Sequence, residues 1–398
     1  MKISHRVDSM QASPIRKFLP YSDAAKARGI KIYHLNIGQP DIETPKEMMD
    51  VYHNFSDKIL SYGPSQGLAS YRKALVTYYK KNDINVTEND IIVTTAGSEA
   101  ITFAMMVTCN PGDEILVPEP FYTNYNGFAS VTGVKLNPIT TYAETGFALP
   151  ERGEIEKLIT PKTKAIMICN PGNPTGKVYP RQAVEMIASI AKERGLYIIS
   201  DEVYREFVYD GLKATSIMEI DGIEENAILV DSISKRYSAC GARIGCIISR
   251  NKSLMAAVLK LAQARLCPPT IDQKAGEACV YLDEHYITDV KNEYCKRRDI
   301  VFNELQKIDG VVCIKPEGAF YIVAKLPIKN AEDFTQWMLN EYSVNNETVM
   351  MAPVTGFYAT PNMGLNEVRL AYVLQEKDLI KAMAIFKSGL IEYKKLAK

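Results

Sequence analysis

One lysine stands out because of the residues around it. In the run SISKRYSACGARIG (residues 232–245), Lys235 follows Ser232 and Ser234 and precedes Arg243. Hydroxyls and a guanidinium together make a charge-assisted site for a phosphate dianion. A lysine that forms a Schiff base needs such a site beside it, a carboxylate elsewhere and a close-fitting backbone. The alternative is an exposed lysine at a strand end, which is the commoner situation for lysines.

A second group of phosphate donors is expected at Gly97, Ser98 and Glu99, where a strand turns into a helix. Backbone N–H groups at a helix N-terminus bind anions, and the helix dipole favours the negative charge. A Gly-Ser turn alone is a weak signal. Together with the serines and Arg243 it predicts one phosphate site.

The carboxylate is expected from Asp201, which directly follows an apolar run. Facing a pyridine nitrogen, it would favour the protonated ring and make the ring a better electron sink. The alternative is a helix N-cap or a salt bridge. Tyr204, three residues on, could donate a hydrogen bond to a ring hydroxyl from the same loop.

Three further residues complete the candidate site. The loop NPGNPTG (170–176) contains two Asn-Pro steps and could aim the side chain of Asn173, although it could also be a plain turn. Tyr122, at a strand end, could cover one face of a flat cofactor or simply fill the core. Arg369 lies within EVRLAYV, where an inward-facing arginine is costly unless it binds an anion such as a substrate carboxylate.

The elements that position these residues follow from the alternation of short β-type runs with helix-length amphipathic segments. The predicted strands cover residues 91–95, 114–118, 164–169, 196–200, 227–231 and 245–249, and the predicted helices 98–109, 180–194 and 253–264. This alternation predicts an α/β fold with a mostly parallel sheet flanked by helices on both faces. Ligands of such sheets bind beyond the carboxyl ends of the strands, which is where five of these strands deliver their polar residues.

The chain has 398 residues, too many for one core of ordinary size, so two domains are expected. We expect a large domain over residues 46–295. A smaller α+β domain is expected from both termini, residues 1–45 and 296–398, with a strand over 32–38.

Composition excludes several other classes of protein. The 47 basic and 47 acidic residues cancel, and no block of like charge suggests a nucleic-acid partner. No apolar run approaches the ~18 residues that span a bilayer, and the N-terminus lacks a signal-peptide core. The eight cysteines form no Cys-x-x-Cys pair and the four histidines show no metal-ligand spacing, so we expect a cytoplasmic protein without a metal.

Together these residues resemble the fold-type-I pyridoxal-phosphate enzymes of the class I and II aminotransferase family, and within it the aspartate aminotransferase-like group. The similarity runs from NIGQPDIETP (36–45) to EVRLAYV (367–373). It implies pyridoxal 5'-phosphate as the cofactor, Lys235 as the Schiff-base lysine and Asp201 as the partner of the pyridinium. Tyr204 and Asn173 would donate to the phenolic oxygen of the cofactor, and Tyr122 would stack on its ring.

The resemblance also assigns the remaining contacts. The phosphate would be held by Gly97, Ser98, Glu99, Ser232, Ser234 and Arg243, with Tyr62 reaching in from a neighbouring subunit of a homodimer. Arg369, Asn173 and the backbone of Gly38 would hold the α-carboxylate of the substrate. This chain departs from the pattern at Tyr122, where close relatives often have tryptophan, and at Glu99, where they have lysine or glutamine. Neither departure removes the chemistry, but because of both the resemblance does not specify the substrate.

The activity implied is amino transfer between an L-amino acid and a 2-oxo acid of the aspartate/glutamate type, by a ping-pong mechanism through Lys235. The alternatives on the same scaffold are a cysteine-conjugate β-lyase, a synthase of the aminocyclopropane type, and an aromatic or branched-chain aminotransferase. A cofactor-binding regulatory module would need a DNA-binding segment that the short, unbasic N-terminus does not supply. For the distal carboxylate of a dicarboxylic substrate the sequence nominates Arg16 or Arg265, and both could equally be surface charges.

Overall fold

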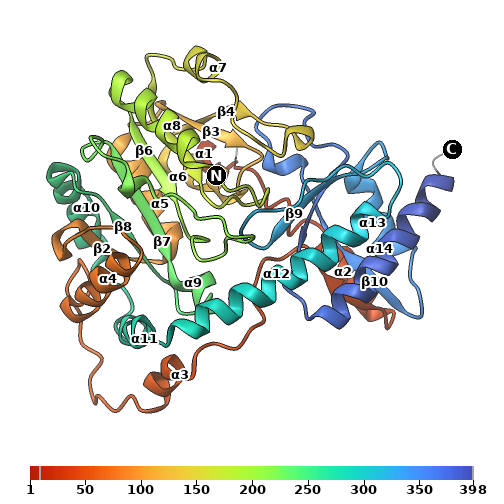
Figure 1. Cartoon of the computed structure of the whole chain (residues 1–398), viewed down its shortest axis with the longest axis horizontal. Coiled ribbons are helices and arrows are strands. Elements are labelled where there is room, and N and C mark those ends of the chain that lie inside the picture. Colours follow the sequence, from red (N-terminus) through yellow and green to blue (C-terminus); the bar gives the residue numbers. More distant parts are fainter. Residues whose placement is uncertain (9, 397–398) are drawn as a thin grey trace.

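The computed structural model describes residues 1–8 and 10–396. Its largest sheet has the strand order β2-β8-β7-β6-β5-β3-β4, in which β8 is antiparallel to both of its neighbours and all other pairs are parallel (Figure 1). The strands are β2 (Ile91–Thr95), β3 (Glu114–Glu119), β4 (Lys135–Thr140), β5 (Thr163–Cys169), β6 (Tyr197–Asp201), β7 (Ala227–Ser232) and β8 (Ile244–Ile248). The predicted mostly parallel sheet is therefore confirmed.

Apolar residues on both sides of each strand explain why this sheet is covered on both faces. In β2, Ile91 and Val93 belong to one buried cluster, whereas Ile92 between them belongs to another. In β5, Ile166 and Met167 divide between the same two clusters. Because successive side chains of a strand point to opposite faces, near-continuous apolar runs require helices on both sides.

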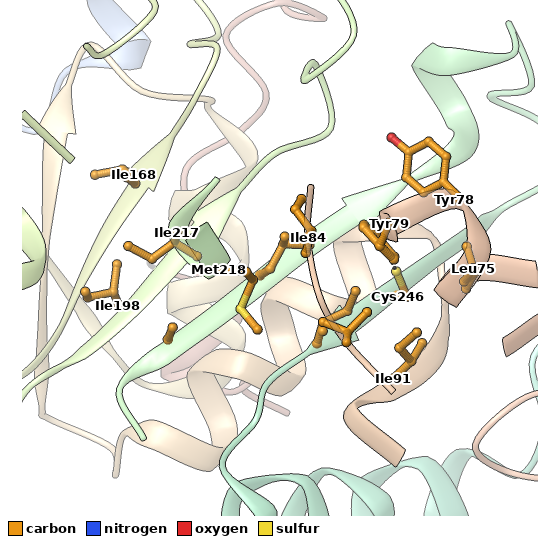
Figure 2. Packing of buried hydrophobic residues seen from close by; sticks show 14 of the residues in the cluster. Leu75, Tyr78, Tyr79, Ile84, Ile91, Ile168, Ile198, Ile217, Met218 and Cys246 are labelled. Carbon is orange, nitrogen blue, oxygen red and sulfur yellow. Dashed lines mark hydrogen bonds between the residues drawn. The ribbon is translucent and has the colours of Figure 1, made fainter. Parts of the chain in front are cut away.

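The helices divide between these two faces. Helices α5 (Ala96–Thr108), α6 (Asn124–Thr132) and α10 (Lys252–Arg265) contribute to one cluster. Helices α4 (Ala69–Lys81), α8 (Arg181–Arg194) and α11 (Thr270–Val280) contribute to the other, together with Met48 of α3 (Lys46–His53) and Ile155 of α7 (Arg152–Lys157). Figure 2 shows part of the second cluster.

Two smaller sheets lie beside the large one. In the first, β1 (Lys31–His34) pairs in parallel with β10 (Glu347–Met350). In the second, β12 (Glu367–Ala371) lies antiparallel between β11 (Ala352–Pro353) and β9 (Tyr321–Lys325). The helices here are α2 (Leu19–Ala27), α12 (Glu284–Gln306), α13 (Ala331–Asn340) and α14 (Glu376–Leu396), so both termini contribute to this part, as Figure 1 shows.

Differences from the predicted elements include whole elements as well as ends. Strand β4 was not predicted, and the strand expected over 32–38 ends at His34. The helices that were not predicted are α1 (His5–Asp8), α3, α4, α6, α7, α9 (Ile233–Arg236) and α11. The division at residues 45/46 and 295/296 stays a prediction; α12 runs through the second boundary, and residues 9, 397 and 398 lie outside the described part.

Candidate active site

One cavity of about 440 Å³ lies at the carboxyl ends of the parallel strands, where the topology of open α/β sheets places ligands. Its size is in the range of cofactor and small-molecule sites. The predicted site residues that line it are Gly38, Gly97, Ser98, Tyr122, Asn173, Asp201, Tyr204, Ser232, Ser234, Lys235, Arg243 and Arg369. Five strand ends, an N-terminal loop and β12 therefore converge on one space.

Two predicted residues do not line this cavity. Tyr62 is 83% exposed on the loop before α4. The Glu99 carboxylate accepts from the Thr95 N–H at 2.8 Å and pairs with Arg265 at 3.2 Å. The prediction for Glu99 concerned its backbone N–H, and it stays a prediction, as does that for Tyr62.

Lys235 is held at the first turn after β7. The Ser232 hydroxyl caps the short helix α9 by accepting from the Ser234 N–H at 3.2 Å. The lysine amine reaches across the cavity and donates to the Gly38 carbonyl at 2.9 Å. No carboxylate is paired with it among the residues that the structure describes, so the amine faces the cavity without a fixed counterion.

Hydroxyls and backbone donors gather at one end of the cavity. Gly97 and Ser98 lie in the first turn of α5, and the Ser232 and Ser234 hydroxyls lie 2.8 Å apart. Arg243 is exposed beside them, and within the described part of the chain its guanidinium donates to a single carbonyl, that of Cys240, at 3.0 Å. These groups are donors with a net positive charge, which is the chemistry of a phosphate site.

Backbone strain is stored at the same end. Ala96, which opens α5, has a φ of 62°, and Arg243 has a φ of 56°. Residues other than glycine rarely adopt the left-handed region, and such strain clusters at functional sites, where the surrounding structure enforces it. Both strained residues line the cavity.

Asp201 ends β6 and is buried on the cavity wall. Its carboxylate accepts from the buried Tyr125 hydroxyl at 2.6 Å, while the Val203 N–H lies 3.4 Å from its second oxygen. Burial raises the pKa of Asp201 to about 6, although these two hydrogen bonds oppose the rise. The carboxylate is thus ready to accept a cationic N–H donor, which would compensate for its lost hydration.

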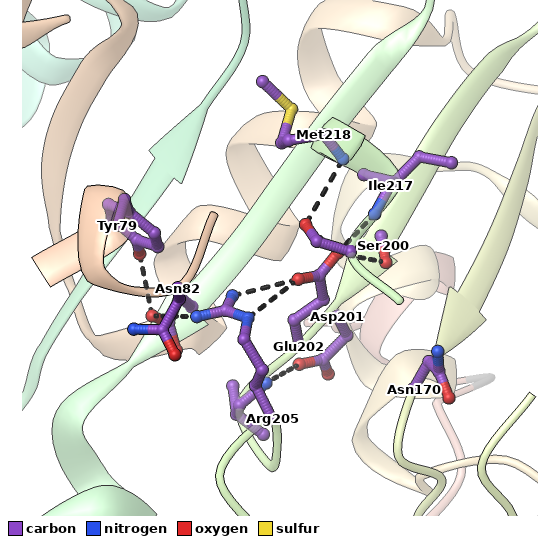
Figure 3. A network of polar contacts seen from close by, with 12 residues as sticks. Tyr79, Asn82, Asn170, Ser200, Asp201, Glu202, Arg205, Ile217 and Met218 are labelled. Atoms are coloured by element: carbon purple, nitrogen blue, oxygen red, sulfur yellow. Dashed lines mark hydrogen bonds and ion pairs between the residues drawn. The ribbon is translucent and has the colours of Figure 1, made fainter. Parts of the chain in front are cut away.

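A buried ionic network adjoins Asp201 and Lys235 along the chain, and Figure 3 shows its part around Glu202 and Arg205. Glu202 accepts from the Ile217 N–H at 2.9 Å and pairs with Arg205 at 2.9 Å. On the β7 side, Arg236 pairs with Asp231 at 2.6 Å and with Glu206 at 2.7 Å. Because Asp201 adjoins Glu202 and Lys235 adjoins Arg236 along the chain, the network fixes both strand ends that carry the candidate site.

Arg369 lies on β12 of the three-stranded sheet, whereas Ser232 and Ser234 belong to β7 and α9 of the part that contains the large sheet. It is 2% exposed and has no acidic partner within residues 1–8 and 10–396. Its guanidinium donates to Asn173 Oδ1 at 3.0 Å and to the Asn36 carbonyl at 2.5 Å, while its buried Nε has no partner. A buried cation without a counterion is costly, and an incoming carboxylate would satisfy it.

Tyrosines form the remaining walls. The hydroxyls of Tyr204 and Tyr321 lie 2.9 Å apart, and a Cβ added to Gly38 would lie only 1.9 Å from the Tyr321 hydroxyl, so this position needs glycine. Tyr122 packs edge-on against Tyr125, with ring centroids 5.5 Å apart. Burial raises the pKa of Tyr122 to about 12, so its phenol stays neutral at physiological pH.

Sequence reasoning missed four residues that shape this site. They are Asn36, Tyr125, Cys240 and Tyr321. Cys240 lies 3.5 Å from the Lys235 amine and Tyr125 contacts Asp201. Tyr125 lies in α6, shortly after the end of β3, and this position is a signal that could have pointed to it. Tyr321 begins β9 of another sheet, and the sequence carries no comparable signal for it.

The cavity combines the Lys235 amine, the buried Asp201 carboxylate and two groups of anion-binding donors. One group contains Ser232, Ser234 and Arg243, and the other is Arg369. The family model described as aminotransferase class I and II matches residues 30–383. The chain belongs to this family. Members of the family use pyridoxal phosphate generally, and the α/β fold with its mostly parallel sheet is the aspartate aminotransferase-like fold that the resemblance implied.

Individual relatives agree with this membership. An aromatic-amino-acid aminotransferase of Thermococcus litoralis is 31% identical, with alignment over 96% of this chain and 100% of the relative. An aspartate aminotransferase of Pyrococcus abyssi is 32% identical, over 96% of this chain and 97% of the relative. The solved alanine aminotransferase of Pyrococcus furiosus superposes with a TM-score of 0.90 at 32% identity, covering 98% of this chain and 100% of that one. The chain is a transferase of the aminotransferase type.

Proposed function

We propose that this chain transfers an amino group between an L-amino acid and a 2-oxo acid of the aspartate/glutamate type, in two half-reactions that share Lys235. The observation that carries the proposal is the convergence of Lys235, Asp201 and the unpaired Arg369 on one cavity. The relatives named above act, by their names, on aromatic amino acids, aspartate and alanine. Their range supports the amino-transfer chemistry and leaves the side chain of the substrate open.

The residues present fit pyridoxal phosphate. Its phosphate would meet the α5 N-terminus, Ser232, Ser234 and Arg243, and its ring nitrogen would meet Asp201. The buried Asp201, with its raised pKa, would regain a cationic partner there. When bound, the cofactor supplies an electron-withdrawing ring that stabilises negative charge at the substrate Cα.

The residues of the chain then divide the work. Arg369 and Asn173 hold the substrate α-carboxylate, because the guanidinium is buried without an acidic partner and already touches the amide. Tyr204 and Asn173 donate to the phenolic oxygen of the cofactor, and Tyr122 covers its ring. The Lys235 amine, as a free base, would take the proton from the substrate Cα as general base and deliver it to the C4′ carbon of the cofactor as general acid.

We also propose that the chain works as a cytoplasmic homodimer. The loop before α4 exposes Ile59, Leu60 and Tyr62, at 77%, 63% and 83%, which is an apolar surface that a second copy could cover. Tyr62 would then reach the phosphate of the neighbouring site. All eight cysteines are free, which fits a reducing compartment. No helix in the described part of the chain is long and apolar enough to cross a membrane.

An absorbance scan tests the amino-transfer reaction. The protein is reconstituted with pyridoxal phosphate, and single amino acids are added without any 2-oxo acid. We expect the visible band of the cofactor to move to the near-ultraviolet with L-glutamate or L-aspartate, with one equivalent of the matching 2-oxo acid released. A band that persists while pyruvate accumulates would instead identify a β-lyase, and no response to any amino acid would refute the proposed function.

A further inference from the structure

Tyr321 contacts three residues to which the proposed function gives a role, although it has no role there itself. Its hydroxyl lies 2.9 Å from that of Tyr204. Its ring centroid lies 4.5 Å from the Arg369 guanidinium, and a Cβ added to Gly38 would overlap its hydroxyl. Tyr321 begins β9, whereas Tyr204 follows β6, so this one side chain joins the three-stranded sheet to the large-sheet part across the cavity.

The hydroxyls of Tyr204 and Tyr321 form an isolated buried pair. The two residues are 3% and 2% exposed, and their rings pack edge to face with centroids 5.7 Å apart. Within residues 1–8 and 10–396, neither hydroxyl has a hydrogen-bond partner besides the other one. Two phenols carry two protons, and the hydrogen bond between them uses one. One proton of the pair therefore remains to be donated elsewhere.

The proposed function decides which hydroxyl keeps that proton. By itself, the distance between the two oxygens permits either hydroxyl to donate to the other. Burial raises the pKa of Tyr204 well above its ordinary value, and the neighbouring Tyr321 adds to the rise, so Tyr204 stays protonated. Under the proposed function this proton is donated to the phenolic oxygen of the cofactor. Because Tyr204 has only one proton, the hydrogen bond within the pair must then come from Tyr321.

We propose that Tyr321 is a positioning residue, whose hydroxyl donates to Tyr204 and thereby orients and strengthens the Tyr204 donor that faces the phenolic oxygen of the cofactor. The inference rests on the proposed function, because Tyr204 must make that contact. Hydrogen bonds in a chain polarise one another, and each strengthens its neighbour by about 10–30%. The alternative is that Tyr321 only packs its ring against Arg369.

The test follows the visible band of the pyridoxal-phosphate-loaded protein as a function of pH, without any substrate. A donor to the phenolic oxygen draws negative charge away from the nitrogen that joins Lys235 to the cofactor, so this nitrogen loses its proton at lower pH. Tyr204→Phe should raise the pH midpoint by about 1–2 units, because one hydrogen bond to a charged group is lost. Tyr321→Phe removes only the hydroxyl and should raise the midpoint by about 0.3 unit.

Two further variants distinguish a relay through Tyr204 from a structural effect. Tyr294→Phe is the matched control, because it removes a buried hydroxyl from the same apolar cluster at a residue that does not line the cavity. It should leave the midpoint at the wild-type value. The double variant of Tyr204→Phe and Tyr321→Phe should have the midpoint of Tyr204→Phe alone, since the Tyr321 hydroxyl acts only through Tyr204.

The outcomes separate this inference from the proposed function. If Tyr204→Phe raises the midpoint and Tyr321→Phe does not, the inference is overturned while the contact of Tyr204 stands. A Tyr321→Phe shift of equal size with and without the Tyr204 hydroxyl would also overturn it, because the effect would not pass through Tyr204. If Tyr204→Phe leaves the midpoint unchanged, Tyr204 does not donate to the cofactor, and the inference fails together with that part of the proposed function.

Discussion

Arg369 provides the first prediction, because its buried guanidinium would gain a partner when a carboxylate binds in the cavity. The guanidinium is 2% exposed and has an unpartnered Nε. Burial without an acidic partner lowers its pKa from the usual value. Arg369→Met removes the charge and the planar donors, and Arg369→Lys keeps the charge but loses the fork that matches a carboxylate.

The size of the effect follows from the number of donors. A carboxylate held by two charge-assisted hydrogen bonds, at about 1.5–3 kcal/mol each, gains about 3–6 kcal/mol. At about 1.36 kcal/mol per factor of ten, Arg369→Met should lower kcat/KM by about 10²–10⁴-fold. Arg369→Lys should lose about tenfold or more, because a point charge replaces the bidentate contact.

The assay measures kcat/KM for L-glutamate together with thermal unfolding of the cofactor-loaded protein. The Arg369 guanidinium donates to Asn173 Oδ1 and to the Asn36 carbonyl, and it lies 4.5 Å and 5.1 Å from the ring centroids of Tyr321 and Phe357. We expect the melting temperature of Arg369→Met to change less than kcat/KM, because no ion pair is broken and methionine can still pack against these rings. An unchanged kcat/KM in Arg369→Met would show that the α-carboxylate is held elsewhere. A strongly destabilised variant would show that Arg369 is structural.

Two further predictions concern the charges behind the site. Because burial raises the Asp201 pKa from 3.8 to about 6, folding disfavours the carboxylate, and the stability of the cofactor-free protein should fall as pH rises from about 4 to about 6. Asp201→Asn should abolish this fall in pH-dependent urea unfolding and weaken pyridoxal phosphate binding; a wild-type pH profile in that variant would contradict the assignment. Arg236→Met removes the cation that pairs with the buried carboxylate of Glu206 and leaves Asp231 only the longer contact with Arg205 at 3.7 Å. It should cost about 3–5 kcal/mol in urea unfolding, and equal stability would refute the network's role.

The sequence predicted the interior of the large sheet well because those strands are buried on both faces. Strand β2 coincides with the predicted 91–95, since its apolar run is uninterrupted. Strand β4 was missed because it pairs only with β3 at the sheet edge, contains Pro138 and is mostly half-buried. The strand predicted over 32–38 ends at His34 because the following residues leave the sheet and line the cavity.

The candidate site was predictable where chemistry follows a strand end. Asp201 and Lys235 come directly after apolar runs, and the carboxyl ends of parallel strands meet at one rim. Tyr321 was missed because it comes from β9 of another sheet, and only the packing of the two sheets brings it to Gly38. The sequence also could not distinguish Arg16 from Arg265. In the fold Arg265 pairs with Glu99, whereas Arg16 lines the cavity.

Lys235 should form the covalent link to the cofactor. This is tested by reducing the pyridoxal-phosphate-loaded protein with sodium borohydride, digesting it and locating the cofactor adduct by mass spectrometry. We expect one adduct, on the peptide that contains Lys235, and none in Lys235→Ala, which should still fold and lack the covalent absorbance band. An adduct on a different lysine, or an unmodified Lys235 in a protein that still transfers amino groups, would contradict it.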